Sequence, residues 1–188
     1  YKRQGLTAQK SLEDLKKLKN SNSPFFLAVG FVKPHLPFTA PKKYWDLYKE
    51  SDIKLPDHNI FPESAPNLAN HKWGELRRYK GIPKIGPIDP EMSKTLIHAY
   101  YASVSYVDAQ IGKLLNALDD LGLRDSTIVV LVGDHGWSLS EHGLWAKHSN
   151  FEVALHVPMI ISAPNFPVNV KTNSICLLYT SDAADDRI

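Results

Sequence analysis

Cysteine and net charge are what this sequence has least of. The 188 residues include one cysteine, Cys176, which excludes a disulfide bond within the chain, and their formal net charge is +2 at pH 7. So small a charge creates no strong basic field of the kind that attracts nucleic acid. The longest apolar run covers residues 25–32, is interrupted by Gly30 and is too short to cross a bilayer. We therefore expect no nucleic-acid partner and no membrane span.

Processing signals are missing as well. The sequence contains no Asn-x-Ser or Asn-x-Thr acceptor for glycosylation, no signal peptide precedes the first expected helix, and the chain starts at Tyr1 rather than at a methionine. Hydrophobic residues make up 43% of the chain and charged residues 22%, as in a globular domain. A chain of this length suits one domain. We expect it to be the middle slice of a longer protein.

Two helices are predicted from apolar spacing and capping signals. In the first, leucines recur at helical intervals between residues 6 and 18, and Thr7 is a possible N-cap. The second begins with Asp89 as N-cap and Pro90 at the first helical position, and Gly122 can end it. The apolar side chains along the second helix predict a buried stripe formed by Ile97, Tyr100, Tyr101, Val104, Val107, Ile111, Leu114, Leu115 and Leu118.

Three apolar runs predict strands, at residues 24–31, 127–132 and 157–162. The middle run is apolar and mostly β-branched, and it predicts a fully buried strand. Residues 51–87 show no sustained period and indicate a long surface excursion, a feature that is often functional in compact domains. The order of strand, excursion, helix, strand, loop and strand predicts a doubly wound α/β sheet.

The C-terminal part of the chain follows a different pattern. From residue 165 onward the periodicity decays, and the last thirteen residues show no relation to what precedes them. We therefore divide the chain into a domain at residues 1–164 and an unrelated or artefactual tail at residues 165–188, in which Cys176 carries no meaning.

Asp134-His135-Gly136 is the most informative motif. It leaves the buried strand at its carboxyl end, the edge of an open α/β sheet at which ligands bind. A carboxylate and an imidazole that adjoin in a turn can share a metal ion, although a polar turn would also account for them. The residues alone would admit calcium, manganese or zinc. The loop that follows carries Trp137 and His142, more large and ionisable side chains than an ordinary connection needs.

His35 and Lys147 complete the candidate site. His35 follows the first strand, and Lys147 lies in the loop that leaves the Asp134 turn, so both are expected at the same sheet edge. A histidine, a lysine and a metal-binding pair suit an anionic ester: the cations neutralise non-bridging oxygens and the histidine protonates the leaving oxygen. Taken singly, each has an ordinary structural explanation, as a surface charge for Lys147 and a packing residue for His35.

Three stretches resemble the sulfatase family of the alkaline-phosphatase-like superfamily. Residues 23–38 resemble its strand followed by the active-site histidine, and residues 100–112 resemble its long helix. Residues 133–158, beginning Gly-Asp-His-Gly-Trp-Ser-Leu-Ser-Glu-His-Gly, are the most specific part. The Asp-His pair, with Trp137 and the Trp-Ala-Lys sequence that ends at Lys147, resembles the branch that acts on iduronate. The resemblance implies an alkaline-phosphatase-like, doubly wound and mostly parallel sheet with flanking helices, here incomplete.

The resemblance also implies roles for the site residues. Asp134 and His135 would bind one calcium ion, Lys147 would hold a sulfate oxygen, and His35 would act near the leaving oxygen. Trp137 and His142 are placed at the substrate, together with Lys147. Calcium prefers oxygen ligands, so the imidazole is an unusual member of this set.

The implied activity is removal of the 2-sulfate of iduronate in heparan and dermatan sulfate, in a lysosomal or secreted enzyme. The family's nucleophile is a formylglycine made from Cys-x-Pro-Ser-Arg, a motif that this sequence lacks, so the chain is expected to be inactive by itself. Two alternatives remain open. One is a phosphonate or phosphate ester hydrolase of the same superfamily, and the other is a paralogue that binds sulfated glycans without cleaving them.

Overall fold

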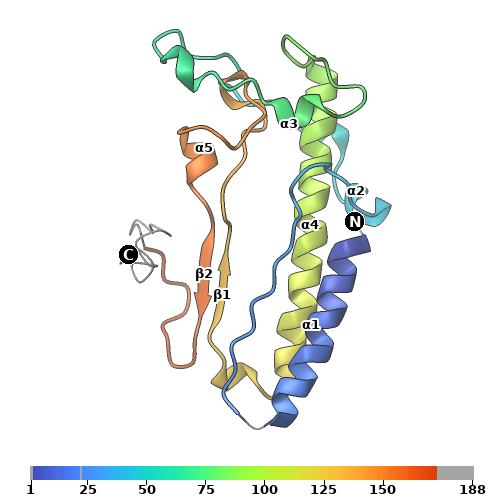
Figure 1. The fold of residues 1–188 in the computed structure, drawn as a ribbon, viewed down its shortest axis with the longest axis vertical. Coiled ribbons are helices and arrows are strands. Elements are labelled where there is room, and N and C mark those ends of the chain that lie inside the picture. The colour runs from blue at the N-terminus through green and yellow to red at the C-terminus, as the bar shows by residue number, and fades with distance from the viewer. Residues whose placement is uncertain (1, 22, 173–188) are drawn as a thin grey trace, which may run out of the picture.

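Two long helices form one side of the molecule. The computed structural model describes residues 2–21 and 23–172, in which α1 (Lys2–Ser21) and α4 (Pro90–Asp120) lie side by side (Figure 1). Helix α1 begins earlier than predicted, so Thr7 lies inside it and its hydroxyl donates to the Arg3 carbonyl at 3.1 Å. The predicted N-cap at Thr7 is therefore wrong.

The start of α4 is as predicted. The Asp89 carboxylate accepts a hydrogen bond of 3.0 Å from the Met92 amide, Pro90 is the first helical residue, and Gly122 has a φ of 62° just past the end. Within α4, His98 is 2% exposed and stacks on Trp45.

The buried stripe of α4 is only partly as predicted. Ile97 and Leu118 are buried, but Tyr101 and Val104 are each 40% exposed. The fully buried set includes small and polar side chains: Ser93, His98, Ala102, Ser103, Tyr106 and Gln110. Hydrophobicity did not identify this face because α4 packs against α1, which buries Ala8 and Ser11.

Short helical elements connect the long helices and the strands along the chain. They are α2 (Lys42–Trp45), η1 (Glu50–Asp52), η2 (Asn67–Ala69), α3 (Gly74–Arg77), η3 (Arg124–Ser126), η4 (Glu141–Gly143) and α5 (Glu152–Leu155). The predicted excursion at residues 51–87 thus contains only brief turns of helix, among them α3.

Strands β1 (Val129–Val132) and β2 (Met159–Ser162) form a two-stranded antiparallel sheet, with Val129 opposite Ser162 and Val132 opposite Met159. Parallel pairing was expected, and for these two strands that expectation is wrong, because the segment joining them folds back instead of crossing over. The prediction that the middle strand, now β1, is fully buried is also wrong, because Val130 is 53% exposed and Val132 is 44% exposed. Residues 24–31 are extended but form no ladder within the described part of the chain.

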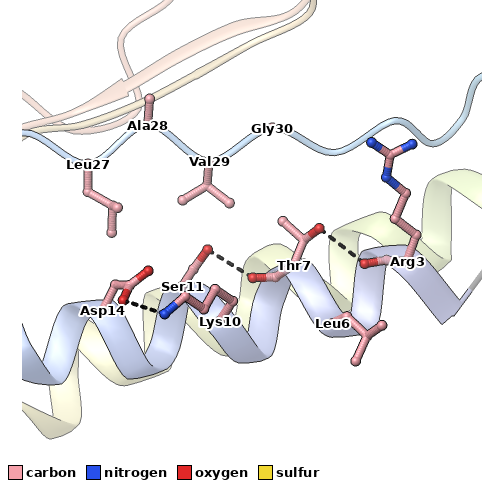
Figure 2. Close-up of a pocket in the computed structure, with 10 residues that line it drawn as sticks. All are labelled: Arg3, Leu6, Thr7, Lys10, Ser11, Asp14, Leu27, Ala28, Val29 and Gly30. Carbon is pink, nitrogen blue, oxygen red and sulfur yellow. Dashed lines mark hydrogen bonds and ion pairs between the residues drawn. The ribbon is translucent and has the colours of Figure 1, made fainter.

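The extended segment packs against the helices on one face only. Phe25 and Leu27 join a small apolar cluster with Leu15, Leu118 and Val129. Above it a pocket of about 440 Å³ opens between α1 and residues 27–30 (Figure 2). Four of its five polar side chains already have partners: Thr7 and Ser11 donate to helix carbonyls, and Lys10 pairs with Asp14, while Arg3 lines the pocket as well. This pocket therefore shows no sign of a binding site.

The larger core lies toward α3 and the N-terminal half of α4. Its buried members are Leu36, Phe38, Ile53, Trp73, Leu76, Ile97, Trp137, Leu144, Trp145 and Ala146. These residues come from five separate stretches of sequence, which brings the site loops together. No helix among the described residues is long and apolar enough to span a membrane.

The boundary predicted at residue 164 stays a prediction. Described residues continue to 172 without a helix or strand after β2. Residues 173–188, which include Cys176, lie outside the described part of the chain.

Candidate active site

His35 is presented by a turn between two prolines. The His35 amide donates to the Val32 carbonyl at 2.9 Å, which starts the turn. Lys33 is 8% exposed. Its ammonium donates to the His35 carbonyl at 3.1 Å and to the Pro37 carbonyl. Burial lowers the pKa of Lys33. A buried lysine thus fixes the backbone from which the imidazole projects.

Lys147 is positioned by the loop that follows β1. The Ser138 amide donates to the Ala146 carbonyl and the Ser140 amide to the Leu144 carbonyl, each at 2.9 Å. These two bonds draw both arms of the loop together, so that Lys147 returns beside Trp137. The Lys147 side chain is only 14% exposed, which is low for an ammonium group.

The two predicted catalytic residues meet directly. The Lys147 Nζ lies 2.9 Å from His35 Nε2, although 112 positions separate them in sequence. The His35 Nδ1 lies 2.9 Å from the Leu36 carbonyl, which can only accept, so Nδ1 carries a proton. In the resting arrangement His35 Nε2 accepts from the Lys147 ammonium. Convergence of these two side chains at one site is confirmed.

Trp137 supports both of them from the core. Its ring lies 6.2 Å from the His35 ring, edge to face, and 5.6 Å from Lys147 Nζ. The residue is 7% exposed and also packs edge-on against Phe38. Its indole Nε1 is buried without a hydrogen-bond partner among the described residues. Trp137 therefore orients the pair by packing and offers little surface to a ligand.

Asp134 and His135 form the candidate metal pair. The Asp134 Oδ2 lies 3.8 Å from His135 Nε2, a spacing that one ion can bridge with bonds of about 2.0–2.6 Å. The His135 Nδ1 lies 2.8 Å from the Gly136 carbonyl, so Nδ1 holds the proton and the Nε2 lone pair is free for a metal. No group of three or more candidate ligands occurs within residues 2–21 and 23–172. The pair thus fits a metal as part of its shell.

The metal pair belongs to the same loop as Lys147 and Trp137. Asp134 is three residues before Trp137, so their α-carbons are at most about 11 Å apart. Gly136 anchors the turn between them: its amide donates to the Ala154 carbonyl at 2.8 Å, and a Cβ at this position would lie 2.0 Å from the Val153 carbonyl oxygen. Only glycine permits so close an approach to α5.

His142 lies elsewhere in the same loop. Its φ is 55°, its amide donates to the His58 carbonyl at 2.6 Å, and its ring stacks on Phe151 at 4.3 Å. His142 also lines a second pocket of about 320 Å³, together with Asp57 and Asn59. Contact between His142 and a substrate stays a prediction.

The sequence analysis missed Glu75. Its carboxylate oxygens lie 3.5 Å from Lys147 Nζ and 3.8 Å from His35 Nε2. The residue belongs to α3, a helix of four residues inside the excursion at 51–87, where no periodic pattern singles it out. Nearby, the rings of His71 and His148 stack at 5.4 Å. The pKa of His71 is lowered mainly by burial and then by His148, while Glu75 opposes the shift.

Comparison with known proteins identifies the family of this chain. The family model described as Sulfatase matches residues 4–174, so the chain belongs to the sulfatase family. Within that family the chain is 44% identical over 164 residues to iduronate 2-sulfatase from Homo sapiens, an alignment covering 84% of this chain and 30% of that relative. It is 35% identical to a sulfatase from Formosa agariphila, covering 83% of this chain and 30% of the relative. The chain thus spans about 30% of the length of these relatives.

Solved structures show the same alkaline-phosphatase-like fold class. A phosphonate monoester hydrolase from Silicibacter pomeroyi superposes with a TM-score of 0.59 at 27% identity, over 82% of this chain and 33% of the other. A Bacteroides fragilis protein assigned as a sulfatase superposes with a TM-score of 0.63 at 29% identity, over 85% of this chain and 30% of the other. The fold class predicted from the sequence is confirmed at this level.

Proposed function

We propose that these residues form the leaving-group side of a sulfuric ester hydrolase that removes the 2-sulfate of iduronate in heparan and dermatan sulfate. The observation that carries the proposal is the contact of 2.9 Å between Lys147 Nζ and His35 Nε2. The substrate class follows from the similarity to iduronate 2-sulfatase. A lysosomal or secreted location goes with this substrate and is part of the proposal.

The two side chains divide the work on the ester. An ammonium that is 14% exposed interacts strongly with an anion, because little water screens it. Lys147 would neutralise a non-bridging sulfate oxygen. His35 would donate the proton on Nε2 to the bridging oxygen as the S–O bond breaks, so that the sugar leaves as an alcohol. In the resting arrangement Nε2 carries no proton, so for this step it must first take up a proton from solvent, while Nδ1 keeps its own proton toward the Leu36 carbonyl.

Asp134 and His135 would hold calcium on the other side of the sulfate. Their contribution is one carboxylate oxygen and one imidazole nitrogen, oriented by the bond from Nδ1 to the Gly136 carbonyl. A bound cation would supply positive charge that polarises the ester for attack at sulfur. Calcium takes six to eight ligands as a rule, so the remainder must come from outside this pair.

The nucleophile is not among these residues. Residue 176, the one cysteine, is followed by Leu-Leu-Tyr-Thr and not by x-Pro-Ser-Arg, so it does not match the formylglycine motif. We therefore expect the 188-residue chain alone to hydrolyse no sulfate ester, and the tests of activity below concern the full-length protein.

Phosphonate ester hydrolysis is the second candidate. It is favoured by the superposition on a phosphonate monoester hydrolase at 27% identity. A site with the same His-Lys pair can serve both chemistries, since both esters carry non-bridging anionic oxygens and an oxygen leaving group.

Turnover of matched esters separates the two functions. The full-length protein should hydrolyse a 2-sulfated iduronate disaccharide at least 100-fold faster, by kcat/KM, than phenyl phosphonate monoesters. The reverse preference would make phosphonate hydrolysis the function. Binding of the disaccharide without turnover would indicate a non-catalytic glycan-binding protein.

A further inference from the structure

The Glu75 carboxylate lies beside Lys147 and His35, at the position where the sulfate group of the proposed substrate would bind. Its Oε2 lies 3.5 Å from Lys147 Nζ and its Oε1 lies 3.8 Å from His35 Nε2. The carboxylate therefore contacts both members of the pair that the proposed mechanism assigns to the sulfate ester. Glu75 belongs to α3, which lies within the surface excursion at residues 51–87.

The position of Glu75 is set by the core and not by the pair it contacts. Leu76, the next residue, is 1% exposed, and Trp73 just before α3 is 5% exposed. The Arg77 guanidinium lies 3.2 Å from the centre of the Trp73 ring and donates to the carbonyls of Pro83 and Gly86 at 2.6 and 2.7 Å. A helix held in this way keeps Glu75 at the edge of the site whether or not a ligand is bound.

The resting Lys147 ammonium needs such a partner. A side chain with 14% exposure has lost most of its water, and a buried charge without a counter-ion is costly. His35 Nε2 accepts one hydrogen bond from Lys147 but is neutral in that arrangement. Glu75 is 38% exposed, so it provides the balancing charge from the open side of the site.

We propose that Glu75 is an internal counter-ion of Lys147, which the anionic group of the substrate displaces from the ammonium, and that it remains beside His35 afterward as a positioning residue. This inference rests on the proposed function for the identity of the anion. The Glu75 Oε1 lies 3.8 Å from His35 Nε2, so the carboxylate can hold the imidazole in place once Lys147 turns to the substrate.

The proposal predicts that removing the charge lowers KM and kcat together. An incoming sulfate no longer competes with an internal carboxylate, so it binds more tightly. Turnover falls because the His35 ring loses the charged partner that positions it. Simple damage to the site would instead raise KM while lowering kcat.

Binding of inorganic sulfate tests the competition without requiring turnover. The probe is sulfate titrated calorimetrically into full-length wild-type protein and its variants at fixed ionic strength. Glu75→Gln should bind sulfate about fivefold more tightly, the size expected for a partly exposed ion pair. Glu75→Asp keeps the charge and should stay within twofold of wild type. The matched control Glu91→Gln breaks an exposed Glu–Lys pair of 3.1 Å on α4 and should change nothing.

The outcomes separate this inference from the proposed function. Tighter sulfate binding in Glu75→Gln that disappears when Lys147→Ala is added supports the counter-ion, even if wild type proves inactive on sulfate esters. Unchanged or weaker binding in Glu75→Gln overturns it, even if wild type is an efficient sulfatase. Should the glutamine variant fail to fold, Glu75→Ala removes the same charge without adding an amide and must show the same tightening.

Discussion

The site around His35 and Lys147 and the β1–β2 sheet are built in opposite ways. At the site, charged groups find partners within the described residues: Lys147 contacts His35 at 2.9 Å and Glu75 at 3.5 Å, over a buried Trp137. In the sheet, apolar side chains are left uncovered, with Ile160 59% exposed and Ile161 52% exposed. The sheet joins the site loop at one end (Figure 1).

The difference separates two requirements of the fold. The arrangement of the site depends on contacts between loops, and this chain supplies those contacts itself. The faces of the sheet depend on neighbours that cover them, and the described residues do not supply these. A contiguous apolar surface of this kind marks an interaction face or an aggregation risk. The site should therefore be more sensitive to point changes, and the sheet more sensitive to its surroundings.

Gly136→Ala should have the largest effect, because it acts on the junction between the two regions. The added Cβ would lie 2.0 Å from the Val153 carbonyl oxygen, so α5 or the Asp134 turn must move. We expect a loss of about 3 kcal/mol or more in the free energy of unfolding, measured by denaturant titration of the full-length protein.

Gly112→Ala is the matched control, since its Cβ meets nothing within 4 Å in the middle of α4. That change should stabilise by about 0.5–1 kcal/mol. Equal effects at the two glycines would contradict this account of the junction.

Self-association of the chain by itself should be the next largest effect. Val130 and Ile161 are cross-strand partners and are 53% and 52% exposed. Replacing both by threonine keeps the β propensity and removes apolar surface, so association of residues 1–188 should fall several-fold in sedimentation experiments. Leu6→Thr, on an isolated leucine of α1 that is 66% exposed, should leave association unchanged. A monodisperse wild-type chain with a sharp cooperative melt would show that the sheet needs no further cover.

The smallest effect concerns acid sensitivity beside the site. Because the pKa of His71 is lowered, the unfolded chain takes up a proton before the folded one as the pH falls. Stability should therefore fall as the pH drops through and below the usual range for histidine. Protonation would also remove the bond of 2.8 Å that His71 Nδ1 accepts from the Trp73 amide. His71→Gln should reduce the loss of Tm between pH 7.5 and 5 by about 1–2 °C, by scanning calorimetry. His148→Gln removes one cause of the shift and should give an intermediate slope, whereas a steeper slope in either variant would reverse this reading.

Local signals in the sequence predicted one part of this molecule well. Asp89, Pro90 and Gly122 determine the ends of α4 through their own hydrogen bonds and backbone angles, so no tertiary information is needed. His35 and Lys147 could be paired because each lies in a segment that follows an apolar run, and both runs were expected to end at the same edge of a sheet. The chemistry of an anionic ester then narrowed the choice among the ionisable residues.

Tertiary contacts decided the rest. The antiparallel direction of β1 and β2 is not encoded in their apolar runs, because the same pattern fits either direction. Glu75 gave no signal, since α3 has four residues and no period, and its role depends on Lys147 arriving from 72 positions away (147 − 75). The exposure of Val130 likewise depends on what covers the sheet and not on its own sequence.

The central claim, that His35 is the proton donor and Lys147 the anion-binding group, is tested most directly by changing the leaving group. In the full-length protein His35→Ala should lower kcat by roughly 10²- to 10⁴-fold, and Lys147→Ala should impair both kcat and KM. An aryl sulfate with an acidic phenol as leaving group needs little protonation. It should therefore restore much of the activity of His35→Ala and little of that of Lys147→Ala. Equal rescue of both variants by the activated ester would contradict the division of roles between the two side chains.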